Sequence, residues 1–434
     1  MNLGYLTYRM LTTASASVII PLIWLHHRNR GQNFGRFYHR LGIYPGDLCK
    51  KFSGNPKIWL HAVSVGEVGV AAAIGNILLQ RYPNCRLMIS TTREQGYARA
   101  RALLGDRATC FFAPLDLVGA TRKALNSIRP DVLALLETEI WPNLIVGAHR
   151  LGARTAIVNG RLSVRSIRLY LRIRSLMQYA LSHIDAFSMI SQDDALRMKS
   201  LGAPAKRITI NGNAKFDNPV TVKDSDSKRW AEKLLALNPA IPVIVAGSTR
   251  HPEEQLVLEA YVKIRQRFPE CLLVIAPRHI ERVDQIAQWV AACGLVMQRR
   301  TELENHWGQR TAPVVILDTI GELSMIYQVA DVVYCGGSLV PKGGQNLLEP
   351  AICGKPVLYG PSMEDFADAR DLIQRAGGGI TIYDADTLSA KALDWLSNPH
   401  RARSAGMAAR RAILPHRGAA GKHADVICEL LSSS

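Results

Sequence analysis

The sequence predicts an α/β protein with two Rossmann-like, doubly wound parallel-sheet domains, preceded by a short apolar helix. Three observations lead to this fold class. The strand candidates are continuously apolar, each is followed by a stretch of helical periodicity such as 69–80 or 95–104, and a polar, turn-rich segment at 212–226 separates two similar halves. Continuously apolar strands are typical of parallel sheets that helices cover on both faces.

The chain begins with an uncharged, largely apolar segment at residues 10–25. A helix of this length reaches about 24 Å, short of the ~20 residues of a comfortable membrane span, so it would cross a thinned bilayer or lie in the interface. A cleaved signal peptide is the competing interpretation, but basic residues replace the small-residue cleavage motif. Arginines follow the segment more often than they precede it, which predicts an uncleaved membrane-anchor helix over residues 1–30 with the body in the cytoplasm.

The two halves each contain five strand candidates. Those of residues 31–218 lie at 58–63, 86–91, 131–137, 155–158 and 186–190. Those of residues 219–434 lie at 243–247, 272–277, 314–317, 332–336 and 356–358. Ligands of doubly wound sheets bind outside the carboxyl ends of the strands, so we expect the functional site there, in a cleft between two domains.

Composition and charge narrow the class of protein. With 434 residues, 48% hydrophobic and 21% charged, the chain is neither a disordered tail nor a small disulfide-stapled module. The net charge of +17 lies entirely in the first half, because residues 1–220 hold 29 basic and 12 acidic residues and the rest holds 24 of each. The first half is therefore expected to meet a polyanion. The eight cysteines are scattered without metal-site spacing, which indicates reduced thiols.

A basic segment lies at residues 161–176. Four of its arginines, spaced four, three and four residues apart, share one face of a predicted helix, and apolar residues cover another face. They are Arg161, Arg165, Arg168 and Arg172 on the first face, and Leu162, Leu169, Ile173 and Leu176 on the second. Such a helix suits an anionic membrane surface, although a helix packed through its apolar side has the same pattern.

Carboxylates follow two strands of the first half. Glu67 stands at the start of a predicted helix. There it would act as a general base, or it would simply interact favourably with the positive end of the helix dipole. Glu137 and Glu139 follow the strand at 131–137. Two carboxylates at the end of a buried strand cost free energy unless they have partners, so at least one is expected to have a function.

Short turns follow the strands of the second half, at 247–251, 277–279, 320–322 and 336–349. Glycine-rich turns that lead into a helix form an anion cradle, and a Glu one turn later can accept both hydroxyls of a ribose. Each turn alone fits an ordinary tight turn, but together they indicate a nucleotide. The sequence contains no P-loop motif and no G-x-G-x-x-G after a strand, which disfavours P-loop NTPases and dehydrogenases.

As a set, these motifs resemble the 3-deoxy-D-manno-octulosonic acid (Kdo) transferases of the lipopolysaccharide inner core. The motifs that carry the resemblance, in the order of the family, are 64–67, 137–143, 215–217, 277–279, 321–323 and 336–349. The resemblance implies the two-domain GT-B glycosyltransferase architecture, transfer with inversion, no catalytic metal, and no cofactor other than the donor substrate CMP-Kdo. It also implies a lipid A precursor, lipid IVA, as acceptor and a location on the cytoplasmic face of the inner membrane, beside anionic lipid.

The resemblance further implies a role for individual residues. Glu67 would be the base that deprotonates the acceptor, and Glu137 and Lys215 would stabilise the transition state. Residues 31–218 would bind the acceptor and residues 219–434 the CMP-sugar. The residues that would hold CMP are Pro277, Arg278, Ile320, Gly321, Glu322, Asn346, Leu347, Leu348 and Glu349.

Two rival functions remain open. One is another GT-B glycosyltransferase or a sugar-nucleotide epimerase that uses UDP, which comparison of CMP and UMP affinities would distinguish. The other is a membrane-associated protein that binds nucleic acid through its basic face, which would show strongly salt-dependent affinity. The sequence contains no recognised nucleic-acid-binding module, so we expect no nucleic acid partner. The oligomeric state is left open.

Overall fold

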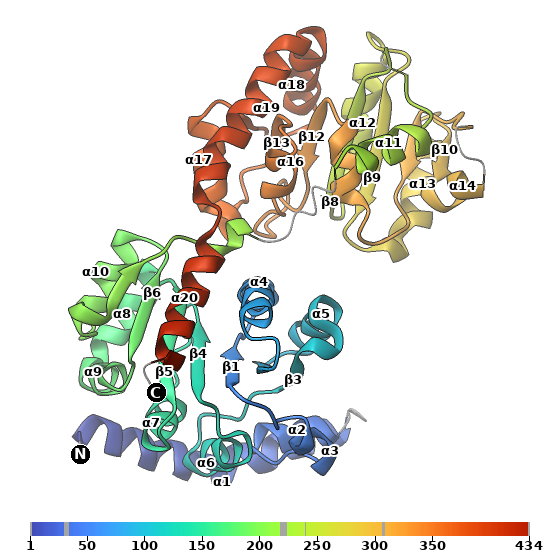
Figure 1. Ribbon diagram of the computed structural model, residues 1–434. Coiled ribbons are helices and arrows are strands. Elements are labelled where there is room, and N and C mark those ends of the chain that lie inside the picture. Colours follow the sequence, from blue (N-terminus) through green and yellow to red (C-terminus); the bar gives the residue numbers. More distant parts are fainter. Residues whose placement is uncertain (1, 30–33, 218–223, 239, 306–308, 433–434) are drawn as a thin grey trace. The chain divides into compact units, whose positions relative to one another are not determined.

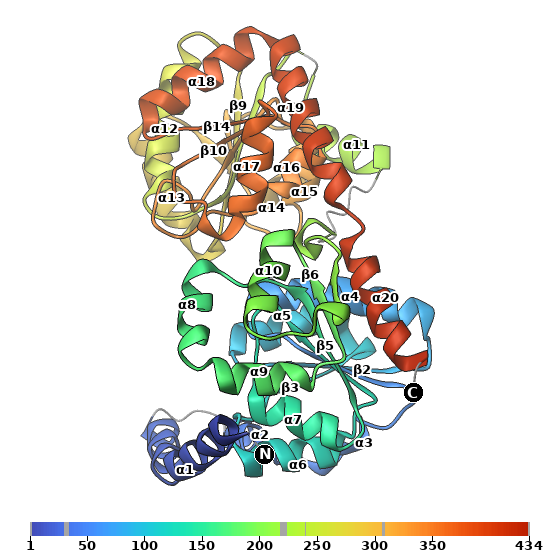
Figure 2. The same cartoon turned by 90° about the vertical axis from the view of Figure 1, so that its left-hand side faces the viewer.

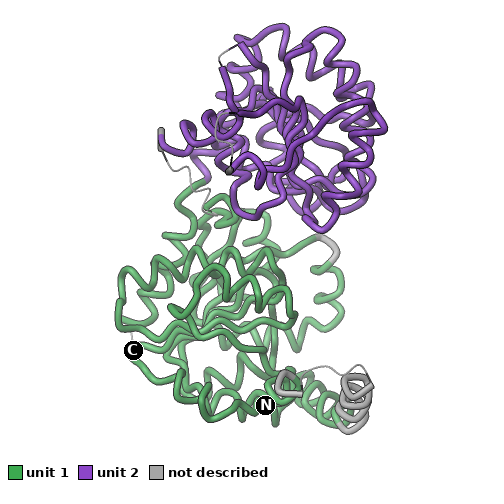
Figure 3. The backbone as a smooth tube through the Cα atoms, turned by 90° about the vertical axis from the view of Figure 1, so that its right-hand side faces the viewer, with its two compact units in different colours: residues 1–218, 417–434 green, residues 219–416 purple. Residues whose placement is uncertain are grey.

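The computed structural model describes residues 2–29, 34–217, 224–238, 240–305 and 309–432. Within its helices, the side chains of residues 17–29, 34–36, 164–165, 224–225 and 305 are not described. The chain folds into two compact units, coloured separately in Figure 3: unit 1 comprises Met1–Asn218 and Arg417–Ser434, and unit 2 comprises Pro219–His416.

Unit 1 is built on a seven-stranded sheet in which every strand pair is parallel (Figure 1). Its strands are β1 (Lys57–His61), β2 (Arg86–Thr91), β3 (Thr109–Phe112), β4 (Val132–Leu136), β5 (Arg154–Gly160), β6 (Ala186–Met189) and β7 (Ile208–Ile210). Their order is β3-β2-β1-β4-β5-β6-β7, so the direction of winding reverses between β1 and β4. This point of reversal is where doubly wound sheets open a crevice for ligands.

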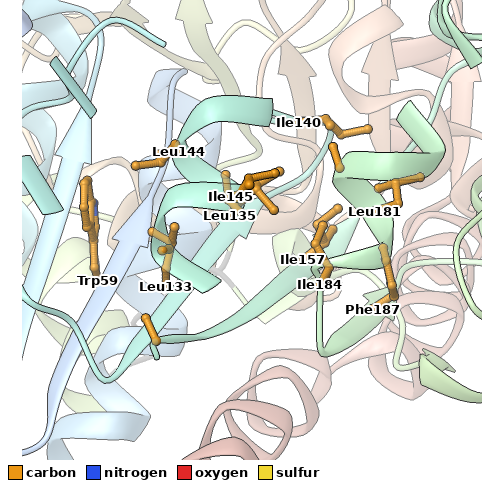
Figure 4. Close-up of a cluster of buried hydrophobic side chains, with 14 of the residues drawn as sticks. Trp59, Leu133, Leu135, Ile140, Leu144, Ile145, Ile157, Leu181, Ile184 and Phe187 are labelled. Atoms are coloured by element: carbon orange, nitrogen blue, oxygen red, sulfur yellow. The ribbon is translucent and has the colours of Figure 1, made fainter. Parts of the chain in front are cut away.

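Successive residues of a strand point to opposite sides of the sheet, and here the side chains on both sides are buried. Trp59, Leu133 and Leu135 enter one cluster, part of which Figure 4 shows, whereas Ile58 and Leu60 enter the other. Helices that cover the first face include α6 (Val118–Ile128), α7 (Pro142–Arg150), α9 (Arg174–Ser182) and α10 (Gln192–Ser200). Helices that cover the second face include α4 (Val65–Arg81), α5 (Glu94–Leu104) and α20 (Ala419–Ser432).

Helix α20 corrects one predicted boundary. Residues 417–434 were expected in the second domain, 219–434, but they belong to unit 1. The reason is apolar packing: Ala420, Ala424 and Ile427 of α20 are buried in the same cluster as Ile74 of α4. The segment carries two basic and two acidic residues, so the excess positive charge of the chain stays in unit 1.

The N-terminal helix α1 (Leu3–Asn29) is attached to unit 1 by its first turns. The Tyr5 ring, 3% exposed, lies 4.9 Å from the Tyr179 ring, and the Tyr8 hydroxyl donates to Asp116 Oδ2 at 2.8 Å. Across the described residues, no helix combines the length and apolarity needed to cross a bilayer. The predicted membrane anchor over residues 1–30 is therefore unsupported, and its side chains from residue 17 onward lie outside the described residues. Helices α2 (Phe34–Arg40) and α3 (Gly46–Lys50) follow.

The basic segment forms α8 (Val164–Arg172), and Ile173 separates it from α9; Figure 2 shows both helices on one side of unit 1. The predicted apolar face is not packed as a whole. Leu162 lies before the helix and is buried, whereas Leu169 and Ile173 are 58% and 44% exposed. The described part of α8 thus presents apolar side chains to solvent beside exposed arginines.

Unit 2 repeats the architecture with a second seven-stranded parallel sheet. Its strands are β8 (Val243–Thr249), β9 (Leu272–Pro277), β10 (Met297–Arg299), β11 (Val314–Ile316), β12 (Val332–Cys335), β13 (Val357–Tyr359) and β14 (Gly379–Thr381). The order is β10-β11-β9-β8-β12-β13-β14, so winding reverses between β8 and β12.

Two apolar clusters again lie on opposite faces of the sheet. Ile244 and Ala246 of β8 enter one cluster, and Val243 and Val245 enter the other. The first cluster includes residues of α12 (Glu253–Arg265), α13 (Val283–Ala292), α18 (Ala385–Ser397) and α19 (Pro399–Ile413). The second includes residues of α11 (Asp224–Leu234), α14 (Arg300–Asn305) and α15 (Leu323–Ile326). Helices α16 (Leu348–Ile352) and α17 (Ala367–Arg375) complete the unit. Two sheets of this kind agree with the predicted α/β class.

Candidate active site

Glu67 lies at the carboxyl edge of the unit 1 sheet, in the first turn of the helix that follows β1. Ser64 is the N-cap of α4, and its Oγ accepts a hydrogen bond from the Glu67 main-chain N–H at 3.2 Å. The Glu67 carboxylate reaches back and accepts from the main-chain N–H groups of Val63 at 2.8 Å and of Ser64 at 3.3 Å. This reciprocal capping box fixes the carboxyl group at the sheet edge, and both interpretations of Glu67, helix cap and base, remain compatible with it.

The pKa of Glu67 is raised to about 7. Burial is the main cause, since the side chain is almost fully enclosed, and the nearby charges of Glu137 and Glu139 raise it further. The hydrogen bonds from Val63 and Ser64 act in the opposite direction. A carboxyl group with a pKa near neutrality can accept and release a proton under physiological conditions.

Glu137 follows β4, which is the neighbour of β1 at the winding reversal. Its backbone has a φ of +51°, an uncommon conformation for a residue other than glycine. Glu137 Oε1 lies 2.9 Å from Lys215 Nζ, and 14% and 26% of the two side chains are exposed. Strained backbone positions of this kind gather at functional sites.

Lys215 is carried by a short 3-10 turn, η3 (Ala214–Asp217), near the end of the first segment of unit 1. The turn is held by Asn159, whose Oδ1 accepts from the Ala214 N–H at 2.8 Å. A side chain at Gly66 would lie 4.0 Å from Lys215 Cε, so the lysine passes close to the turn that bears Glu67. The three residues predicted as catalytic are therefore gathered at one edge of unit 1.

Glu139, the other carboxylate of this strand end, has a different partner. Its Oε2 accepts from Trp141 Nε1 at 2.7 Å, and the Trp141 ring lies 4.5 Å from the ring of His61. Burial raises the pKa of Glu139 and lowers the pKa of His61 to about 3, which keeps that imidazole neutral. Glu139 influences Glu67 through its charge, which raises the pKa of Glu67.

In unit 2, the predicted nucleotide residues lie after β9 and around α15. Pro277 is buried at the end of β9, and Arg278 is exposed, with its main-chain N–H donating to Thr249 O at 2.9 Å. Ile320 is 84% exposed, and Gly321 has a φ of +97°, which makes a turn that projects from the sheet edge.

Glu322 is fixed by a partner that sequence reasoning missed. Arg300 is 5% exposed and forms an ion pair with Glu322 at 2.6 Å, and Thr319 Oγ1 also donates to Glu322. Arg300 lies on α14, away from the predicted motif in sequence and without any spacing relation to it. Local sequence patterns therefore carried no signal for this contact.

The predicted run from Asn346 to Glu349 divides into two kinds of residue. Leu347 and Leu348 are buried, so only their main-chain groups are available to a ligand. Asn346 Nδ2 donates to Glu349 Oε1 at 3.0 Å, and Asn346 Oδ1 accepts from the Leu348 N–H at 3.0 Å. The amide thus shapes the start of α16 and orients the carboxylate behind it.

A cavity of about 470 Å³ occurs elsewhere in unit 2. It is lined by residues just before the strands, such as Pro242, Asp331 and Pro356, and therefore lies at the amino edge, opposite the predicted nucleotide residues. Among the residues that the structure describes, no group of three or more His, Cys, Asp or Glu side chains is arranged to hold a metal ion.

This chain is similar in sequence to known proteins over most of its length. Residues 35–218 match a family model described as 3-deoxy-D-manno-octulosonic-acid transferase (kdotransferase). The 3-deoxy-D-manno-octulosonic acid transferase of Bordetella pertussis is 31% identical over 440 residues, covering 96% of this chain and 98% of the relative. That of Haemophilus influenzae is 30% identical over 401 residues, covering 90% of each chain.

Among solved structures, a glycosyltransferase from Rickettsia africae covers 88% of this chain and 100% of its own, with 13% identity and a TM-score of 0.57. A UDP-GlcNAc 2-epimerase from Neisseria meningitidis has 11% identity and the same TM-score, and covers 87% of this chain and 100% of its own. Both likenesses concern the fold alone. The sequence relatives decide the family: this chain belongs to the 3-deoxy-D-manno-octulosonic acid transferases, which are glycosyltransferases.

Proposed function

We propose that this chain transfers Kdo from CMP-Kdo to a hydroxyl group of a lipid A precursor, lipid IVA, with inversion and without a catalytic metal. The observation that carries this proposal is Glu67: a buried carboxyl group with a pKa near 7, fixed at the winding reversal of the unit 1 sheet. A general base works best when its pKa lies near the working pH. Membership in the Kdo transferase family supports the sugar that is moved.

In the proposed step, the Glu67 carboxylate takes the proton of the acceptor hydroxyl while the hydroxyl oxygen bonds to the anomeric carbon of Kdo. The bond from that carbon to the phosphate oxygen of CMP breaks, and its electron pair leaves with CMP. Because attack and departure occur on opposite faces of the sugar, the configuration inverts. Lys215, held by Glu137, supplies a fixed cation beside the base, where preorganised charge stabilises the transition state.

CMP is proposed to lie at the carboxyl edge of the unit 2 sheet. The exposed guanidinium of Arg278 offers a charged donor for phosphate, and Glu322 and Glu349 are oriented carboxylates that suit sugar hydroxyls. The main-chain groups of Leu347 and Leu348 complete this surface. This division assigns the acceptor to unit 1 and the donor to unit 2.

We also propose that unit 1 contacts an anionic membrane surface on the cytoplasmic face of the inner membrane. Leu169, Leu171 and Ile173 are 58%, 44% and 44% exposed, and Arg168 and Arg172 are exposed on the same helix. Exposed apolar side chains interleaved with arginines are typical of helices that lie in a membrane interface. The full chain should float with anionic liposomes more than with neutral ones, and equal flotation with both would refute the contact.

Mass spectrometry of the lipid acceptor tests the proposed reaction. Incubation of lipid IVA with CMP-Kdo and the protein should add the mass of one or more Kdo residues, and the increments give the number of sugars. Calorimetry should show that CMP binds and UMP does not. Transfer from a UDP-sugar, or tighter binding of UMP, would favour the rival that uses UDP.

A further inference from the structure

Unit 2 contains a buried carboxylate that the proposed step does not use. Glu253 begins α12, directly after the turn that leaves β8, and its side chain is 0% exposed. A buried carboxylate is costly unless every oxygen is hydrogen-bonded. Its position at the winding reversal between β8 and β12, rather than in the interior of a helix, calls for a specific role.

The Glu253 carboxylate accepts five hydrogen bonds. The donors are four main-chain N–H groups and one hydroxyl: Gly337 N at 2.6 Å, Arg250 N at 2.8 Å, Ser338 N and Leu339 N at 2.9 Å each, and Tyr334 Oη at 2.7 Å. Three consecutive N–H groups of the turn after β12 therefore point at one carboxylate. In its absence these N–H dipoles would face one another without an acceptor, and the turn would open.

The turn that Glu253 shapes is joined to the predicted CMP residues. Gly337 adopts a φ of +67°, and its carbonyl oxygen accepts from the Gly344 N–H at 2.9 Å. A side chain at Gly337 would fall 3.1 Å from Gln345 Nε2, so this turn also packs against the residue that precedes Asn346. The position of Asn346 at the start of α16 thus depends on the turn.

We propose that Glu253 is a positioning residue for donor binding. It holds the turn at 336–339 in one conformation, and the turn holds the segment at 344–349 that presents Asn346 and Glu349 to CMP. This inference rests on the proposed function, because it assigns CMP to that segment. Glu253 itself touches no substrate, so its effect should appear in donor binding and leave acceptor binding unchanged.

Glu253→Gln tests the inference, because the amide keeps the size of the side chain but turns an NH₂ group toward the N–H donors. The dissociation constant of CMP and the KM for CMP-Kdo should each rise about tenfold, since hydrogen bonds to a charged group are lost. The KM for the lipid acceptor should stay within about twofold, a split that general loss of packing would not produce. Glu259→Gln, an exposed position on the same helix, is the matched control and should leave every value unchanged.

Failure of this inference and failure of the proposed function give different results. A folded Glu253→Gln variant whose donor constants match the wild type would overturn the inference. If that variant does not fold, Tyr334→Phe decides, because it removes a single donor to Glu253 and keeps the buried ring. Tyr334→Phe should raise the CMP dissociation constant about threefold, and an unchanged constant would overturn the inference. A wild-type protein that neither binds CMP nor transfers Kdo would instead contradict the proposed function.

Discussion

Lys215 Nζ and Glu137 Oε1 form an ion pair at 2.9 Å, although Glu137 follows the central strand of the unit 1 sheet and Lys215 follows an edge strand. Glu137 follows β4, and Lys215 lies on η3, after β7. The pair is partly buried, so its members depend on each other for compensation of charge. Lys215 also lies close to the turn that carries Glu67, the proposed base.

A double-mutant cycle of Lys215→Met and Glu137→Gln should therefore show strong coupling. Lys215→Met alone leaves a carboxylate without its cation and should destabilise the protein by about 1–3 kcal/mol. The double variant should lose less than the sum of the two single changes. Urea denaturation measures the stabilities, and additive losses would mean that the pair contributes nothing beyond its separate side chains.

The pH dependence of transfer should report Glu67. A base acts in its ionised form, so kcat/KM should rise with pH up to the pKa of Glu67, about 7, and level off above it. Because the charge of Glu139 raises this pKa, Glu139→Gln should move the midpoint to lower pH. A rate profile that is flat between pH 5.5 and 8 would argue against Glu67 as the base.

Asp217 should control the docking of the C-terminal helix. Its two carboxylate oxygens accept hydrogen bonds from the main-chain N–H groups of Gly418 and Ala420, at the start of α20. Asp217→Ala removes this cap and should cost about 1–2 kcal/mol of stability. Hydrogen exchange should become faster in α20, while the exposed Asp193→Ala serves as control. Unchanged exchange in α20 would show that packing alone holds the helix.

Chelation tests the proposed independence from metal. Addition of EDTA to dialysed enzyme should leave the rate of Kdo transfer unchanged, because the proposed step draws its charge stabilisation from Lys215 and from donors in unit 2. Loss of activity that Mg²⁺ or another divalent cation restores would contradict metal-independent transfer.

The sequence predicted the central strands well and missed the outer ones. The ten predicted strands correspond to central strands, two of them with exact bounds, β2 and β9. The four that were missed, β3, β7, β10 and β14, are the edge strands of the two sheets. An edge strand is paired on one side only, so it is short and less uniformly apolar, as in Met297–Arg299, and its pattern is weak.

The candidate site shows the same limit at the level of residues. Strand-end motifs placed Glu67 and Glu137 correctly after two strands of the unit 1 sheet. The structure adds that these strands, β1 and β4, are neighbours, so that parallel topology brings their ends together. Sequence could not place α20 against α4, or Arg300 beside Glu322, since these contacts arise from tertiary packing without a spacing rule. It also could not separate the buried Leu347 and Leu348 from their polar neighbours.

The most direct test of the proposed mechanism is single-turnover Kdo transfer by Glu67→Gln, measured together with CMP affinity. The Gln oxygen can keep the capping-box bond from the Ser64 N–H, and only the bond from the Val63 N–H is lost, so the variant should fold and bind CMP like the wild type. Without a base, transfer should fall by about 10²–10⁴-fold. A Glu67→Gln enzyme that transfers Kdo at the wild-type rate would remove Glu67 from the chemistry and contradict the mechanism.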